Sequence, residues 1–190
     1  MAKYARRRAL VVGEAGGIGL AVAKRLVEGG ASVVLTARTA GERARAVAEL
    51  GSAARVVAPS GVEAVLAAQA GTGSGGTGEG GVDLLFTDAV PTARALLPHL
   101  EDGSAIVLTA PAPCPDAVRE FAAELAFRGI RVNAVAPGCI EAPGTGALPL
   151  PPLGRLGAAE EVARAALFLA TEATFTTGVR LPVDGGLGCP

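Results

Sequence analysis

The chain has 190 residues, half of them hydrophobic, and its 17 basic and 18 acidic side chains leave a formal net charge of −1. This length suits one domain with a substantial core. Neither sign of charge dominates a long block, and the sequence holds no Trp, one Tyr and five Phe. We therefore expect neither a nucleic-acid surface, which needs basic and stacking side chains, nor a polybasic membrane patch.

The sequence contains few residues that could bind a metal ion, and it lacks the apolar segment of a secretion signal. The three cysteines, Cys114, Cys139 and Cys189, lack the spacing of metal ligands, and His99 is the only histidine, so no metal site is predicted. The basic start of the chain is followed by an apolar run, Ala9–Val12, that is too short for a secretion signal. No apolar run reaches the roughly 18 residues of a membrane helix. We expect a soluble, cytoplasmic protein.

Short β-branched runs alternate along the chain with longer segments of helical periodicity. The predicted strands are Ala9–Val12, Ser32–Thr36, Arg55–Ala58, Val82–Thr87, Ala105–Thr109, Arg131–Ala136 and Val179–Val183. The predicted helices are Ile18–Glu28, Glu42–Leu50, Val62–Ala70, Thr92–Leu100, Asp116–Arg128 and Ala158–Thr171. Continuous apolar runs are typical of strands covered on both faces. The alternation predicts an α/β fold, a doubly wound, Rossmann-like parallel sheet of about seven strands in a single domain over residues 1–190.

Two glycine-rich segments interrupt this alternation. Gly71–Gly81 reads GTGSGGTGEGG and lies between a helix and a strand, so we interpret it as a surface connector and not as a domain boundary. Gly138–Gly157 is rich in Gly and Pro and directly follows the sixth strand. Long loops in compact domains are uncommon and often cover a ligand, so this segment is predicted to be a substrate-binding or lid loop.

A glycine-rich turn connects the first strand to the first helix. It reads VVGEAGGIG from Val11 to Gly19. Gly13 suits the tight turn, Gly17 lets the backbone approach a pyrophosphate, and Gly19 allows the helix to pack closely on the strand. The helix then directs free N–H groups at the phosphates. The alternative is that these glycines serve only the packing of helix on sheet.

With this turn, the chain resembles the short-chain dehydrogenase/reductase family, in particular its β-ketoacyl carrier-protein reductase branch. Further motifs are GIRVNAVAPG over 129–138, GRL over 154–156, EEVA over 160–163 and VDGG over 183–186. The resemblance implies a dinucleotide at the carboxyl ends of the strands. No acid follows the second strand, and a cation, Arg38, stands in its place, which favours the 2′-phosphate of NADP(H) over NAD(H). If a dinucleotide binds, the residues expected to contact it are Gly13, Gly17, Ile18, Gly19, Arg38, Ala89, Pro137 and Gly138. The alternative is that none binds, because Glu14 puts a negative charge in the turn, no Asp follows the third strand, and Ala142 stands where the family has Thr.

The resemblance also implies a Ser, a Tyr and a Lys that transfer a proton to the substrate carbonyl, and the sequence departs from this pattern. The expected Ser falls at Ala110 or Pro111, and the stretch 112–118, where Tyr-x-x-x-Lys belongs, reads APCPDAV. The chain holds one Tyr, Tyr4, and two Lys, Lys3 and Lys24. The connections after the fourth and fifth strands are also shorter than the family's, so the chain is interpreted as truncated, and the family's dimer interface is in doubt.

Other chemistry would have to come from side chains at the same sheet edge, because parallel sheets bind ligands outside the carboxyl ends of their strands. The polar residues that arrive there are Asp88, Thr109, Cys114, Asp116, Cys139 and Glu141. A carboxylate whose pKa is raised by burial could act as acid or base. Glu141 is the first candidate and Asp88 the second; the alternative for Glu141 is a solvated loop charge.

Three functions stay open at this point. The favoured hypothesis is an atypical, non-redox enzyme acting on a small molecule in biosynthesis. The second is a catalytically silent protein that senses a nucleotide or completes a homo- or hetero-oligomer. The third is an NADP-dependent reductase with a substitute proton donor, such as water or Glu141.

Overall fold

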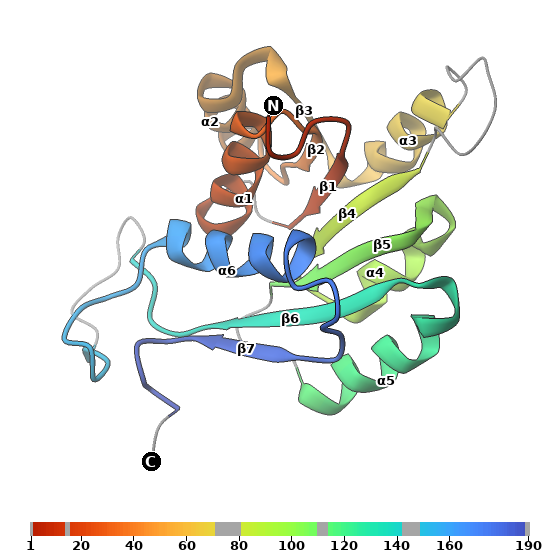
Figure 1. The fold of residues 1–190 in the computed structure, drawn as a ribbon. Helices are drawn as coiled ribbons and strands as arrows, with labels where there is room; N and C mark the ends of the chain where they lie inside the picture. Colours follow the sequence, from red (N-terminus) through yellow and green to blue (C-terminus); the bar gives the residue numbers. More distant parts are fainter. Residues whose placement is uncertain (1, 14–15, 71–80, 110–113, 142–148, 189–190) are drawn as a thin grey trace.

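The computed structural model describes residues 2–13, 16–70, 81–109, 114–141 and 149–188. Seven strands form one parallel sheet in the order β3-β2-β1-β4-β5-β6-β7 (Figure 1). They are β1 (Arg8–Val12), β2 (Ser32–Thr36), β3 (Ala54–Val57), β4 (Val82–Thr87), β5 (Leu100–Leu108), β6 (Arg131–Pro137) and β7 (Arg180–Val183). The predicted α/β fold is confirmed.

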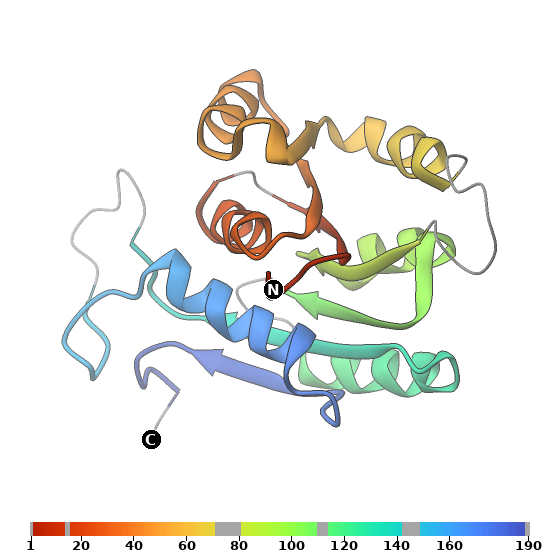
Figure 2. The ribbon, with the colours of Figure 1, turned by 45° about the horizontal axis from the view of Figure 1, so that its top comes forward.

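Helices cover both faces of the sheet (Figures 1 and 2). They are α1 (Gly17–Glu28), α2 (Ala40–Leu50), α3 (Val62–Ala70), α4 (Val90–Leu96), α5 (Pro115–Leu125) and α6 (Ala159–Thr171). Side chains of α1, α2 and α6 form one core with one face of the strands, and side chains of α3, α4 and α5 form a second core with the other face. Successive residues of β1 alternate between these cores: Ala9 and Val11 join the first, and Leu10 joins the second. None of the described helices combines the length and the apolar character needed to cross a membrane.

Strand β5 differs most from its prediction. It begins at Leu100, five residues before the predicted start, and the preceding helix ends at Leu96. Leu100 is buried and pairs with Val82, and the register then shifts before Leu84. A 3-10 turn, Leu97–His99, leads from α4 into β5, and the pairing of the buried Leu100 with Val82 ends the helical segment there. The connection from β4 to β5 spans only residues 88–99, with a helix of 7 residues.

Two polar side chains of β6 hold α6 and β7 in place. Asn133 is 1% exposed; its amide nitrogen donates to the carbonyl oxygen of Thr176 at 2.9 Å, and its Oδ1 accepts the N–H of Val179 at 3.0 Å. The half-buried guanidinium of Arg131 donates to the carbonyl oxygens of Leu169 at 2.7 Å and Ala173 at 3.0 Å, at the end of α6. Burial lowers the pKa of Arg131 from its ordinary value.

Backbone hydrogen bonds join the two ends of the segment that follows β6; we call these paired ends the loop base. The N–H of Glu141 donates to the carbonyl oxygen of Gly157 at 2.8 Å, and the N–H of Gly157 donates to that of Cys139 at 2.9 Å. Next to this base, Arg155 and Glu161 form two hydrogen bonds of 2.8 Å, and Glu161 also accepts the N–H of Ala158 at 2.9 Å. The predicted loop Gly138–Gly157 therefore starts and ends at one place; its residues 142–148 lie outside the described residues, as do residues 71–80 of the predicted surface connector.

Removal of the Asn133 side chain tests the packing of β6 against β7. Asn133→Ala leaves the carbonyl of Thr176 and the N–H of Val179 without their partner, so we expect the free energy of unfolding to fall by about 2–4 kcal/mol. The control is Ser104→Ala, because the Ser104 hydroxyl is buried without a hydrogen-bond partner in the described residues, and we expect its change to stay within about 0.5 kcal/mol. Urea unfolding measures both. Equal losses in the two variants would contradict this account.

The ion pair of Glu161 predicts a pH dependence of stability. The Arg155 guanidinium, and after it the N–H of Ala158, lower the pKa of Glu161 from 4.5 to about 2. Because the folded-state pKa is lower than the unfolded one, the pair stabilises the protein above about pH 4.5, and this contribution is lost as the pH falls towards 2. We expect the difference in unfolding free energy between wild type and Glu161→Gln to shrink over this range. A difference that stays constant between pH 4.5 and 2 would show that the ion pair does not contribute in this way.

Candidate functional site

The glycine turn lies at the carboxyl end of β1, where it leads into α1. Gly13 has φ +150° and Gly17 has φ +51°, values that side chains disfavour. Gly16 precedes the first helical residue; no side chain caps the helix there, and its first turn carries no acidic residue. The first N–H groups of α1 therefore lack a side-chain acceptor among the described residues, which leaves a positive helix end. Residues 14 and 15 lie outside the described residues.

The glycines of this turn have free space beside them where a side chain would lie. A Cβ atom added at Gly13, Gly16 or Gly17 meets no atom of the described residues within 4 Å. At Gly16 the φ angle is −128°, which any residue adopts. Neither backbone conformation nor packing against the described residues therefore requires glycine at position 16. The half-buried Ile18 and Gly19 follow in α1.

The end of β2 contributes two residues to the same edge. Thr36 is fully buried, and its Oγ1 accepts the N–H of Gly13 at 3.0 Å and donates to the carbonyl oxygen of Gly13 at 3.2 Å. The sequence analysis missed Thr36, although a polar residue at the end of an apolar strand was the available signal. Arg38 is exposed two residues later, and its N–H donates to the carboxylate of Glu42 at 2.9 Å. Thr39 caps α2 by accepting the N–H of Glu42 at 3.1 Å.

The two candidate carboxylates do not line a common hollow. Asp88 is exposed directly after β4, before the half-buried Ala89 that precedes α4. Glu141 is exposed after β6 and lines a hollow of about 490 Å³ with Lys24 and Gly17 of α1. Glu49 and Glu160 line the same hollow, which Asp88 does not reach. Both carboxylates thus lie at the predicted sheet edge, and Lys24 is a neighbour of Glu141 that the sequence analysis did not identify.

Gly138 has a packing role that is visible in its contacts. Its N–H donates to the carbonyl oxygen of Val183 at 3.0 Å, and an added Cβ would lie 2.7 Å from the Cα of Asp184. Pro137, half-buried, ends β6 just before it. The Asp184 carboxylate accepts the N–H of Gly186 at 2.9 Å. This edge of the sheet therefore requires glycine at 138 for close contact with the end of β7.

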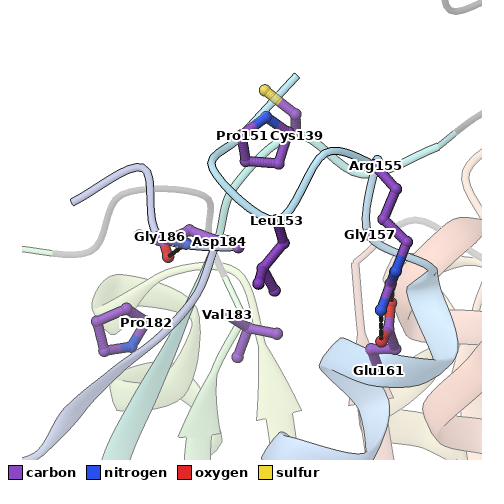
Figure 3. A pocket seen from close by; sticks show the side chains of 11 residues that line it. Cys139, Pro151, Leu153, Arg155, Gly157, Glu161, Pro182, Val183, Asp184 and Gly186 are labelled. Carbon is purple, nitrogen blue, oxygen red and sulfur yellow. Dashed lines mark hydrogen bonds and ion pairs between the residues drawn. The ribbon is translucent and has the colours of Figure 1, made fainter. Parts of the chain in front are cut away.

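A second hollow of about 320 Å³ lies beside the end of β7 (Figure 3). Leu153 extends toward Val183 on one side, and the ion pair of Arg155 and Glu161 forms another wall. The half-buried Cys139 lines it as well, whereas Cys114 is exposed before α5. This hollow is built from the loop base, β7 and the start of α6, and it does not include the glycine turn.

The only tyrosine of the sequence lies at the opposite edge of the sheet. Tyr4 is 7% exposed, and its N–H donates to the carbonyl oxygen of Gly29, just past the C-terminal end of α1, at 2.7 Å. Lys3 forms an ion pair of 2.7 Å with Glu172 after α6. Because α1 runs from the glycine turn to Gly29, the length of this 12-residue helix, about 18 Å, separates Tyr4 from the turn.

Comparisons with known proteins agree with this architecture. The family model described as short chain dehydrogenase matches residues 7–104, and the one described as Enoyl-(Acyl carrier protein) reductase matches residues 110–188. The 3-oxoacyl-(acyl-carrier-protein) reductase FabG of Thermotoga maritima is 51% identical over 79 residues, which are 36% of this chain and 32% of that protein. The aligned part of this chain therefore spans about a third of the length of such relatives.

Two further relatives align over nearly the whole chain. The cis-4-hydroxycyclohexanecarboxylate dehydrogenase of Sinomonas cyclohexanicum is 32% identical over 241 positions, covering 96% of this chain and 97% of that protein. The FabG reductase of Vibrio cholerae is 32% identical, covering 94% and 96%. From the parallel sheet, the glycine turn and these matches, we conclude that the chain belongs to the short-chain dehydrogenase/reductase family.

Proposed function

We propose that this protein binds a dinucleotide, NADP(H) in preference to NAD(H), at the glycine turn, and that it does not reduce carbonyls by the route of its family. The observation that carries the proposal is the open space at Gly16. Neither φ nor packing against the described residues requires glycine there, and a glycine without a side chain leaves the backbone open to the close approach of a ligand.

The residues present fit the ligand. The N–H groups of Gly16, Gly17 and the first turn of α1 would hold the pyrophosphate, because free N–H groups and the helix dipole favour an anion. Arg38 at the end of β2 would hold the 2′-phosphate, which distinguishes NADP(H) from NAD(H). When bound, the nicotinamide of NADPH would supply a hydride, and this chain's part is to bind and orient the dinucleotide.

The second half of the proposal rests on proton transfer. A positioned general acid contributes a factor of about 10²–10⁴ in rate. The family's Tyr and Lys have no counterpart over 112–118, and Tyr4 and Lys3 lie at the other edge of the sheet. The expected serine position, 110 or 111, lies outside the described residues but is Ala or Pro in the sequence. We infer that the family's catalytic residues are missing and that the dinucleotide acts as a regulatory ligand, in a nucleotide-sensing or partner protein.

The lengths of the aligned chains support a truncation. The alignment with the Sinomonas dehydrogenase runs over 241 positions, more than the 190 residues of this chain, so the relative has residues without a counterpart here. The short connection over 88–99 and the 11-residue helix α5 agree with shortened crossovers after β4 and β5.

A second candidate function comes from the hollow at Glu141. There, a carboxylate and the ammonium group of Lys24 line one space next to the first residue of α1. Such a pair can move a proton without a redox step, which would suit the atypical, non-redox enzyme. If Glu141 serves as the base, Glu141→Gln abolishes turnover of its small-molecule substrate without unfolding the protein.

Thermal unfolding tests the dinucleotide. At a concentration of NADP⁺ about 100 times its Kd, we expect a gain of about 2.7 kcal/mol, or a rise in Tm of about 5–10 °C. Arg38→Ala reduces the shift with NADP⁺ to that with NAD⁺, because the contact to the 2′-phosphate is lost. The control is Arg43→Ala, an exposed arginine of α2. No shift with either dinucleotide at millimolar concentration would refute the binding.

The absorbance of NADPH tests whether the protein reduces a carbonyl group. With NADPH and a ketone substrate of the family, such as a 3-oxoacyl thioester, we expect no oxidation above the rate without protein. Robust oxidation would contradict the non-catalytic role, and its loss in Glu141→Gln would identify Glu141 as a substitute donor, whereas its retention would point to water.

A further inference from the structure

The glycine turn begins where β1 loses its backbone partners. The ladder between β1 and β2 ends at the pair Val11 and Leu35, and the ladder between β1 and β4 ends at the pair Val12 and Thr87. Gly13 lies beyond both, with φ +150°. Its N–H and carbonyl groups need partners, because it is half-buried and the sheet no longer supplies them.

The hydroxyl of Thr36 supplies both partners. Its Oγ1 accepts the N–H of Gly13 at 3.0 Å and donates to the carbonyl oxygen of the same residue at 3.2 Å. The backbone of Thr36 continues the ladder on its other side, where Thr36 pairs with Val57 of β3 and the next N–H, that of Ala37, donates to the carbonyl oxygen of Val57 at 2.8 Å. A fully buried side chain therefore joins the turn to a fixed strand.

We propose that Thr36 is a positioning residue for the dinucleotide: its hydroxyl sets the orientation of the Gly13 peptide groups and so aims the turn at the pyrophosphate. This inference rests on the proposed function. Among the described residues of the turn no side chain gives equivalent support, because Val12 carries no hydroxyl and Gly13, Gly16 and Gly17 carry no side chain. Thr36 also precedes Arg38 by two residues, so the same strand end fixes the turn and carries the contact for the 2′-phosphate.

The decisive variant is Thr36→Val, which keeps the shape of the side chain and removes the hydroxyl. We expect the Kd for NADP⁺ and the Kd for NAD⁺, measured by isothermal titration calorimetry, to rise together by about tenfold, which is the effect of one to two lost hydrogen bonds. Their ratio stays constant because Arg38 is unchanged. Thr36→Ser restores the hydroxyl and is expected to return both Kd values to within about twofold of wild type.

Thr177 offers a matched control at the other end of the sheet. Its Oγ1 likewise accepts the N–H of Val132 at 3.0 Å and donates to the carbonyl oxygen of Val132 at 3.4 Å, at the start of β6. Thr177→Val thus loses the same pair of bonds far from the turn, and we expect it to lower Tm without changing either Kd. A positioning role separates the two variants in affinity, which a merely structural role would not.

Hydrogen exchange gives a readout that needs neither ligand nor variant. In the ligand-free wild type, the amide of Gly13 is expected to be protected, since its N–H is donated to a buried hydroxyl. Free exchange at Gly13, wild-type Kd values in folded Thr36→Val, or failure of Thr36→Ser to rescue would each overturn the role of Thr36. A wild type that protects Gly13 but binds neither dinucleotide would instead refute the proposed function. If Thr36→Val does not fold, the exchange result and the Thr36→Ser affinities decide.

Discussion

The hydrogen bonds between the Thr36 hydroxyl and Gly13 occupy the point at which the parallel sheet stops supplying backbone partners. Strands that run side by side must diverge where their chains turn into helices, and the polar groups at that point need other partners. Here one threonine meets this need for the turn that leads into α1.

The motifs that relate the chain to its family at the other end of the sequence serve structure. Arg131 and Asn133 bind carbonyl and N–H groups of α6 and of the segment before β7, and Gly138 lets the end of β6 approach Asp184 closely. These residues secure the last helix and the edge strand on the sheet. Their contacts are structural and carry no information about which reaction, if any, the protein performs.

The helices and strands were predictable from the sequence where burial of apolar side chains determines their bounds. Strands covered on both faces produce continuous apolar runs, and β2 and β4 have the predicted bounds. The start of β5 at Leu100 was not predictable, because it depends on pairing with Val82. The carboxyl edge gave the right place for Asp88 and Glu141, yet the proximity of Lys24 to Glu141 arises from the packing of α1 beside the loop base, which no sequence spacing encodes.

Binding and chemistry make different demands on this edge of the sheet. A pyrophosphate is held by backbone N–H groups and a helix end, which survive most side-chain substitutions as long as the turn keeps its shape. The resemblance implies that carbonyl reduction in this family requires three particular side chains after β5 and on the helix that follows it, and the loss of a positioned acid alone lowers the rate by about 10²–10⁴. Side-chain substitutions that leave the backbone unchanged therefore abolish catalysis well before they abolish binding of the ligand. This asymmetry is the physical reason why we propose a nucleotide-binding role for this chain in preference to carbonyl reduction.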